Sequence, residues 1–435
     1  MQDFLCIIIK YAPCESVFSG LFAKSFLRTV IIMKPCVKIG SLFMAVLMAL
    51  TALFAVGCTP ISLSAQWAYK SGDNELPIGV YIYSLNSAYA QAQTYASEQI
   101  KDYDAKTDKW LDEKIKDDDG KEQVAREWIK EQAELMCLSY LVVDEQIVKE
   151  KAEVTKDMLA TADEQAKEYW NVGPAEYVQM GYYMPYKNQF EQYGVSLESF
   201  AYCTTEYSTK YSALFEAIYD KGGSQEVSDS ELTQYFNENY SDYSYVFVNL
   251  YESTADEASD EGTKNVALAE DEVKKLKKEF DGYAKKLNDG ADFDDVMKDY
   301  MKANDMEDDP STSAIEDLEK NSSLGDELKE AIKKIDGKGA ATIQVGKDDS
   351  AVYYLVYKRD IKSTSDKYLA DDANRSSVLS AAKSEDFADY IEELTKKLDF
   401  EANTAQLDRY DPKMFFVKPE DSDENADDDA STEEE

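Results

Sequence analysis

The segment from Ser241 to Tyr251, SDYSYVFVNLY, alternates polar and apolar side chains with the period of a half-buried β-strand. Two further strand candidates follow later in the chain, AATIQV at 340–345 and AVYYLVYKR at 351–359, and the turn GKDDS separates them. Strands need partners within a sheet, so these three segments place a β-containing unit in the middle of the chain.

Helical patterns fill the interval between the strand candidates. A short helix begins at a capping box formed by Ser228 and Glu231, just before the first strand. A longer helix is closed by Gly290 and carries an apolar stripe of Val273, Leu276, Phe280, Tyr283 and Leu287. Two shorter helices follow, interrupted by a break at DMEDDPSTSA, and the second ends at Ile335. The order strand, helices, strand, strand predicts an α+β domain over residues 228–361.

A second domain is predicted to be helical and to surround the first. Residues 76–227 have helical periodicity, and DKGGSQ at 220–225 marks a domain boundary. A final amphipathic helix carries an apolar stripe of Phe387, Ile391, Leu394 and Leu398. This stripe needs a partner, and the simplest partner is the helical region that ends before Asp220. Residues 362–412 therefore complete the helical domain, and the predicted fold class is α+β with the α+β domain inserted between two helical parts.

The N-terminal region determines the expected compartment. From Met33, two lysines precede an apolar run at 39–54, which small residues and a cysteine follow as AVGC at 55–58. This order is typical of a secretory signal peptide. Residues 1–57 are therefore predicted to be an upstream extension before a start at Met33, followed by the signal peptide. An uncleaved transmembrane helix is the alternative, and in both cases most of the chain lies outside the cytoplasmic membrane.

The end of this region also predicts a lipid anchor. AVGC resembles a bacterial lipobox, in which cleavage before cysteine leaves a thiol to be acylated, although leucine is usual where Ala55 stands. Cys58 is therefore the predicted lipidation site, and the protein is predicted to be an extracytoplasmic lipoprotein attached to the cell membrane. Residues 58–75 are expected to form a tether between the anchor and the folded chain.

The charge of the chain restricts its partners. With 87 acidic and 47 basic residues the formal net charge is -40, and residues 413–435 form an acidic tail that we expect to be disordered. Nucleic acid is excluded as a partner, because phosphate binding needs a basic patch. The same negative charge attracts cationic peptides and the positive stretches of unfolded chains.

The residue inventory excludes several kinds of catalytic site. The chain has no histidine, which rules out histidine-based triads, histidine metal sites and imidazole general bases. In the mature chain, Cys137 and Cys203 remain after Cys58, and they are open either to pairing or to staying free. Two cysteines cannot build a structural zinc site, and the chain has no phosphate loop or dinucleotide fingerprint. We therefore expect neither a metal nor a cofactor.

Three segments resemble the extracytoplasmic parvulin-type foldases, the SurA and PrsA lipoprotein family. QYGVSLESFAYCTTEYSTKYSALFEAI, followed by VSDSELTQYFNENYSDY, is similar to the end of the family's chaperone domain and the start of its isomerase domain. LNDGADFDDVMKDYMK looks like a helix start of that isomerase domain, and LKEAIKKIDGKGAATIQVGKDDSAVYYLVYKRD resembles its closing helix and hairpin. The resemblance implies a helical chaperone domain, an inserted peptidyl-prolyl isomerase-like domain and a C-terminal helix that returns to the first.

The chain departs from this family at the catalytic positions. Active members carry a histidine in the first strand and another in the last, and the matching positions here lie near Val248 and at Tyr353 or Tyr354. A shaped apolar pocket can lower the barrier of roughly 20 kcal/mol to isomerisation with little acid or base. We therefore assign no catalytic residue and expect a degenerate domain that is weakly active or inactive as an isomerase.

An aromatic segment of the helical domain is the predicted client-binding surface. Tyrosine and methionine side chains adapt to many partners, so they suit a groove for extended polypeptide. The candidates are Trp170, Met180, Tyr182, Tyr183, Met184 and Tyr186. The alternative is that these residues pack the helical core.

Together these features predict a membrane-anchored extracytoplasmic chaperone or foldase that binds unfolded, newly exported polypeptides. Two alternatives stay open. One is a non-catalytic surface lipoprotein that acts as an adaptor or a solute-binding component, and the other is an active peptidyl-prolyl cis-trans isomerase.

Overall fold

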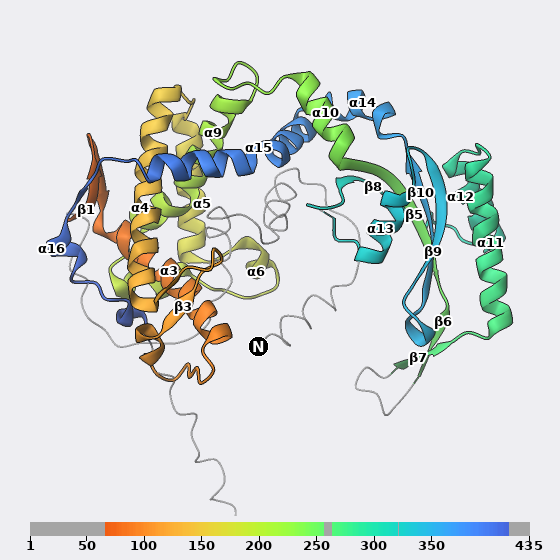
Figure 1. Ribbon diagram of the computed structural model, residues 1–435, viewed down its shortest axis with the longest axis horizontal. Coiled ribbons are helices and arrows are strands. Elements are labelled where there is room, and N and C mark those ends of the chain that lie inside the picture. Colours follow the sequence, from red (N-terminus) through yellow and green to blue (C-terminus); the bar gives the residue numbers. More distant parts are fainter. Residues whose placement is uncertain (1–65, 256–262, 321, 417–435) are drawn as a thin grey trace, which may run out of the picture. The chain divides into compact units, whose positions relative to one another are not determined.

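The fold was described from a computed structural model that covers residues 66–255, 263–320 and 322–416 (Figure 1). The fold class is α+β, as predicted. The described chain forms two compact units. The helical unit comprises 66–232 and 372–416, and the α+β unit comprises 233–371.

Two long helices form the centre of the helical unit. Helix α3, Ile78–Gln99, packs against α4, Ala125–Glu150, and both contribute many buried side chains to one hydrophobic core. The smaller helices around them are α5 (Lys156–Asn171), α6 (Ala175–Gln179), α7 (Tyr186–Phe190), α8 (Leu197–Ala201) and α9 (Tyr207–Tyr219). Short 3-10 turns η4 (Lys109–Asp112) and η5 (Glu191–Tyr193), a π-helical turn η6 (Tyr202–Glu206) and the hairpin β3–β4 (Lys114–Lys116 and Glu122–Val124) connect these helices.

The final helix α15, Asp372–Thr395, returns to the helical unit (Figure 1). Its Phe387 ring lies 4.6 Å from the ring of Tyr211 and 5.4 Å from that of Phe215, both on α9. The prediction that its apolar stripe packs on the helical region before Asp220 is confirmed.

The prediction of a tether over residues 58–75 is wrong for its second half. Strand β1, Trp67–Ser71, pairs with β2, Asn74–Pro77, and with β11, Glu401–Ala402. The reason is that Ala68 and Tyr69 are buried in the core of the helical unit, while Gly72 takes the positive φ of 55° that the turn requires.

The prediction that the acidic tail begins at residue 413 is also wrong. After α16, Thr404–Leu407, the 3-10 turn η9 at Pro412–Phe415 buries Phe415. The Phe415 ring lies 4.9 Å from the ring of Tyr193 and 5.7 Å from that of Tyr89. The aromatic side chain of Phe415 therefore holds this segment to the helical unit.

The α+β unit contains an antiparallel sheet with the strand order β8-β5-β10-β9. The first strand, β5 at Tyr240–Asn249, pairs along its length with β10 at Val352–Arg359, so the first and last predicted strands are neighbours. The other elements are β6 (Tyr251–Ala255), β7 (Thr263–Ala267), α11 (Glu270–Asn288), α12 (Phe293–Ala303), β8 (Thr312–Asp317), α13 (Asp326–Lys334), β9 (Gly339–Val345) and α14 (Ser365–Leu369). The 3-10 turns η7 (Asp348–Ser350) and η8 (Ile361–Ser363) precede and follow β10.

Each face of this sheet has its own core. Helices α11 and α12 cover one face, and α13 lies on the other (Figure 1). Helix α11 ends as predicted, since Gly290 has a φ of 100° and its N–H donates to the carbonyl of Leu287 at 3.1 Å. The sheet is therefore a central layer whose alternating side chains belong to two separate hydrophobic clusters.

Strand β8 and the ribbon β6–β7 were not predicted. The segment of β8 was predicted as part of a break, and it instead forms an edge strand that pairs with β5, for example Ala314 with Tyr243. The ribbon β6–β7 is exposed along its length and carries no alternating apolar face. Backbone pairing rather than side-chain burial therefore defines these strands.

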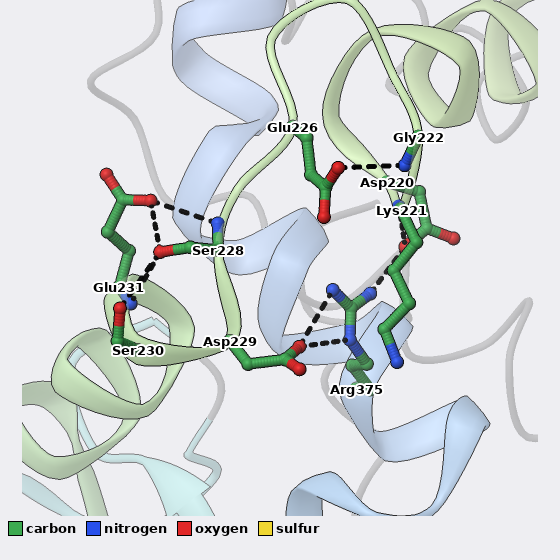
Figure 2. Close-up of polar contacts among 9 residues, drawn as sticks. All are labelled: Asp220, Lys221, Gly222, Glu226, Ser228, Asp229, Ser230, Glu231 and Arg375. Carbon is green, nitrogen blue, oxygen red and sulfur yellow. Dashed lines mark hydrogen bonds and ion pairs between the residues drawn. The ribbon is translucent and has the colours of Figure 1, made fainter.

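The chain leaves the helical unit after Leu232, within helix α10 at Asp229–Asn239, and returns to it at Asp372. The capping box predicted before α10 is present, with the N–H of Glu231 donating to Ser228 Oγ at 3.2 Å and the N–H of Ser228 donating to Glu231 Oε2 at 2.9 Å (Figure 2). The predicted domain boundaries of 227/228 and 361/362 therefore lie before the observed ones. The last turns of the α+β unit include Tyr368, whose ring stacks 5.0 Å from that of Phe236 on α10.

Candidate functional site

The predicted client-binding segment divides into buried and exposed residues. Trp170 is buried, and its ring lies 5.3 Å from that of Phe200. Tyr186 is partly buried, with its ring 5.4 Å from Phe200 and 6.1 Å from Phe190. Burial is the main cause that raises the pKa of Tyr186. For Trp170 the structure favours the alternative that it packs the helical core, and Tyr186 packs against that core with part of its surface open.

Three residues of the same segment are exposed. Met180, Tyr182 and Tyr183 have 54%, 62% and 70% of their surface open to solvent, and we call these three residues the loop cluster. Met184 is half-buried. Large apolar side chains with this exposure in three of four consecutive positions are the feature expected of a polypeptide-binding surface.

Hydrogen bonds hold the backbone at the end of α6, where the loop cluster begins. Helix α6 ends at Gln179, and Gly181, the residue after its C-cap, has a φ of 84°. The N–H of Gly181 donates to the carbonyl of Val178 at 2.9 Å, and the N–H of Tyr182 donates to the carbonyl of Tyr177 at 2.8 Å. These two bonds form a Schellman motif, in which glycine supplies the left-handed residue. The loop cluster is thus presented by a helix terminus of fixed shape.

A second contact fixes the other end of the loop. The N–H of Met184 donates to the carbonyl of Val172 at 3.1 Å. Gly173, with a φ of 108°, lies very close to the backbone of Met184. A Cβ added at Gly173 would stand 2.7 Å from the Met184 carbonyl oxygen. The loop cluster therefore lies between two anchored points, which reduces the ordering entropy lost when a partner binds.

The three degenerate isomerase positions do not share one face of the sheet. Tyr353 and Val248 are direct cross-strand partners, and both pack on the face covered by α11. Tyr353 Oη donates to Asp281 Oδ1 on α11 at 2.8 Å, and burial raises the pKa of Tyr353. Tyr354 points to the opposite face and pairs with Phe247. Val248 and Tyr353 are therefore structural residues of the covered face.

An aromatic row occupies the opposite face. The ring centroids of Tyr243 and Tyr245 are 6.3 Å apart, those of Tyr245 and Tyr354 are 5.9 Å apart, and those of Tyr354 and Phe247 are 5.5 Å apart. Tyr243 packs under α13, whereas Phe247 at the other end has 47% of its surface exposed. We call Tyr245, Tyr354 and Phe247 the aromatic face. The sequence of Ser241–Tyr251 already indicated an aromatic face, because positions 243, 245 and 247, which lie on one side of a strand, are all aromatic.

The two cysteines of the described residues are not placed to act as nucleophiles. Cys137 and Cys203 are both free and buried in the helical unit. Burial raises the pKa of the Cys137 thiol to about 12, and burial also raises the pKa of Cys203 well above its ordinary value. Both thiols are therefore protonated near neutral pH, whereas the reactive form of cysteine is the thiolate. Cys58, the predicted lipidation site, lies outside the described residues.

Other kinds of site find little support within the described residues. That part of the chain holds no group of three or more acidic or cysteine side chains placed to bind a metal ion. A surface hollow of about 530 Å³ is lined by Gln99, Lys114, Lys116 and Glu122. Lys114 and Glu122 already form an ion pair there, since Lys114 Nζ lies 2.9 Å from Glu122 Oε1. No helix in the described ranges combines the length and the apolar character needed to span a bilayer.

Comparison with known proteins gives matches among solved structures alone. No protein-family description and no curated protein matches the chain. The foldase protein PrsA of Streptococcus pneumoniae strain Canada MDR_19A is similar at 15% sequence identity, over 70% of this chain and 100% of that chain, with a TM-score of 0.30. The foldase protein PrsA of Lactococcus lactis is similar at 11% identity, over 81% of this chain and 100% of that chain, with a TM-score of 0.31.

Proposed function

We propose that this protein is a membrane-anchored extracytoplasmic chaperone that holds unfolded, newly exported polypeptides. The loop cluster carries the proposal, because it exposes two tyrosines and a methionine at a hydrogen-bonded helix terminus, while the neighbouring Trp170 is buried. Rings and thioethers of this kind contact many apolar sequences without requiring one fixed partner shape.

The α+β unit supplies a second surface for the same clients. An extended polypeptide can lie along the aromatic face, where Phe247 and Tyr354 meet across two paired strands. Its aromatic side chains offer stacking and apolar contact, and histidine is absent from the whole chain. We therefore assign binding rather than efficient isomerisation to this unit.

The sequence supports the anchor. The apolar run at 39–54 and the cysteine at position 58 have the order of a lipoprotein signal peptide, and a lipid anchor would hold the chain where newly exported polypeptides emerge unfolded. Acylation of Cys58, checked by mass spectrometry of the membrane-extracted protein, tests this part of the proposal independently of binding.

The loop cluster is tested by suppression of aggregation. A chain that begins at residue 59, and so carries no lipid, should keep a chemically unfolded client in solution at equimolar concentration. The double substitution Tyr182→Ser and Tyr183→Ser should reduce this suppression several-fold, since exposed rings are lost and the fold is kept. Light scattering of the client measures the effect, and circular dichroism of the variant checks that it is folded.

Val148 provides a matched control. It lies on α4, and 78% of its surface is exposed, so Val148→Ser also removes an exposed apolar side chain from the helical unit. This control should suppress aggregation as well as the parent chain. Equal losses in the control and in the tyrosine variant, or no suppression by the parent chain, would contradict the proposal.

A further inference from the structure

The loop cluster lies within an acidic part of the helical unit. From Asp163 to Glu191 the chain has five acidic residues against two basic ones, namely Asp163, Glu164, Glu168, Glu176 and Glu191 against Lys167 and Lys187. Three of these carboxylates are placed on the elements that hold the loop cluster. Glu168 is in the last turn of α5, Glu176 is in the first turn of α6, and Glu191 follows α7.

These three carboxylates are available to a partner. Glu168, Glu176 and Glu191 are all exposed. Among the residues that the structure describes, none of the three has a lysine or arginine nitrogen within ion-pair distance. Other exposed acids differ in this respect, as Glu122 does with Lys114 at 2.9 Å. The negative charge around the loop cluster is therefore not neutralised by the protein itself.

Helix α6 places Glu176 in its first turn, four residues before its C-cap Met180, so this carboxylate lies next to the loop cluster along the chain. The pKa of Tyr186, raised mainly by burial, is raised further by the Tyr177 phenol and the Glu176 carboxylate. Burial is also the main cause of the raised pKa of Tyr169, and the carboxylates of Glu176 and Glu168 add to it. Of the three carboxylates, Glu176 is therefore the one that the fold places nearest to the loop cluster along the chain.

We propose that the loop cluster selects polypeptide segments in which lysine or arginine lies next to apolar residues. This inference rests on the proposed chaperone function and names the class of segment that is bound. Apolar side chains of the segment pack on Met180, and its cationic groups lie over the exposed rings of Tyr182 and Tyr183 and near the unpaired carboxylates. The net charge of -40 adds a long-range attraction for such segments.

Three matched peptides test the selection. Each is a fluorescently labelled, unfolded 12-residue peptide with the same leucine and phenylalanine positions, and the remaining positions are lysine, glutamine or glutamate. Binding to the chain from residue 59 is measured by fluorescence anisotropy. We expect the lysine peptide to bind about tenfold more tightly than the glutamine peptide, the glutamate peptide to bind most weakly, and the differences to shrink in 0.5 M salt.

Charge variants then locate the effect. The triple substitution Glu168→Gln, Glu176→Gln and Glu191→Gln should lower the affinity for the lysine peptide towards that for the glutamine peptide. A control with the same change in net charge replaces Glu98, Glu113 and Glu153, which are also exposed in the helical unit, by glutamine. The control should keep most of the preference for lysine.

The outcomes separate this inference from the proposed function. Equal binding of all three peptides overturns the charge selection and leaves the chaperone function standing. Equal effects of the two triple variants overturn the local assignment, because the preference would then arise from the whole charge of the chain. Binding of none of the peptides overturns the proposed function and the selection with it.

Discussion

Gly173 and Gly181 both have positive φ angles near the loop cluster, yet their surroundings differ. An added Cβ at Gly173 would meet the Met184 carbonyl oxygen at 2.7 Å, whereas nothing lies within 4 Å of the same position at Gly181. We expect Gly173→Ala to lower the free energy of unfolding by about 2–4 kcal/mol and Gly181→Ala by about 1 kcal/mol. Urea unfolding of both variants measures the difference, and equal values would contradict the close approach seen at Gly173.

Residue identity alone did not separate the exposed from the buried members of the predicted client-binding set. Tyr182 is exposed and Tyr186 packs on the core, although both are tyrosines in the same short segment. Tyrosine has an apolar ring and a polar tip, so its sequence pattern is compatible with either environment. The packing of α5 and α8 decides which rings are covered, and that packing depends on residues distant in the sequence.

Among the elements, α15 depends on one buried cation. Arg375 is buried, and its guanidinium reaches Asp220 Oδ1 at 2.5 Å and Asp229 Oδ1 at 3.4 Å (Figure 2). It therefore joins the start of α15 to the end of α9 and the start of α10. This arrangement holds together the points at which the chain leaves the helical unit and returns to it.

Replacing Arg375 tests this role. We expect Arg375→Met, which keeps most of the apolar stem, to lower the free energy of unfolding of the helical unit by about 1–3 kcal/mol. Asp220→Asn should destabilise more than Asp229→Asn, because the Asp220 side chain is 37% exposed and that of Asp229 is 77% exposed. Urea unfolding followed by tryptophan fluorescence reports on this unit, since Trp110 and Trp128 lie in its core. The reverse order of the two aspartate variants would contradict the contact geometry.

Strong periodic patterns predicted elements well, and weak ones did not. The stripes of α11 and α15 and the alternation of β5 gave elements of the expected type, because each pattern reflects burial of one face. Strand β8 escaped prediction because Thr312 and Ser313 are exposed on a sheet edge. Helix α3, which begins at Ile78, has no polar face in its first turns, since both sides of them are buried.

At the scale of the whole molecule, the chain contains an α+β unit but no histidine. We expect the chain from residue 59 to isomerise a proline tetrapeptide at close to the spontaneous rate. The reason is that Phe247 and Tyr354 of the aromatic face supply no imidazole. A protease-coupled isomerisation assay measures this rate, with an active isomerase as the positive control. Turnover far above the spontaneous rate would show that the aromatic face is catalytic.

The sequence predicted the inserted arrangement more readily than it predicted the binding residues. The insertion follows from a final apolar stripe that needs a distant partner, which is a requirement of burial. The aromatic face, in contrast, forms where Phe247 and Tyr354 meet across paired strands. The degenerate positions were predicted near Val248 and at Tyr353 or Tyr354 without this register, which depends on the whole sheet and places Tyr354 beside Phe247.

The pairing of β1 with β11 has a consequence for the order in which the protein folds. Tyr69 is paired with Ala402, and the side chain of Asn403 donates to the carbonyl of Trp67 across a sequence separation of 336 residues. During synthesis from the N-terminus, β1 emerges long before that partner. If residues 233–371 fold first, the effective loop that must close becomes shorter, so we expect the inserted unit to speed completion of the unit formed by the flanking segments.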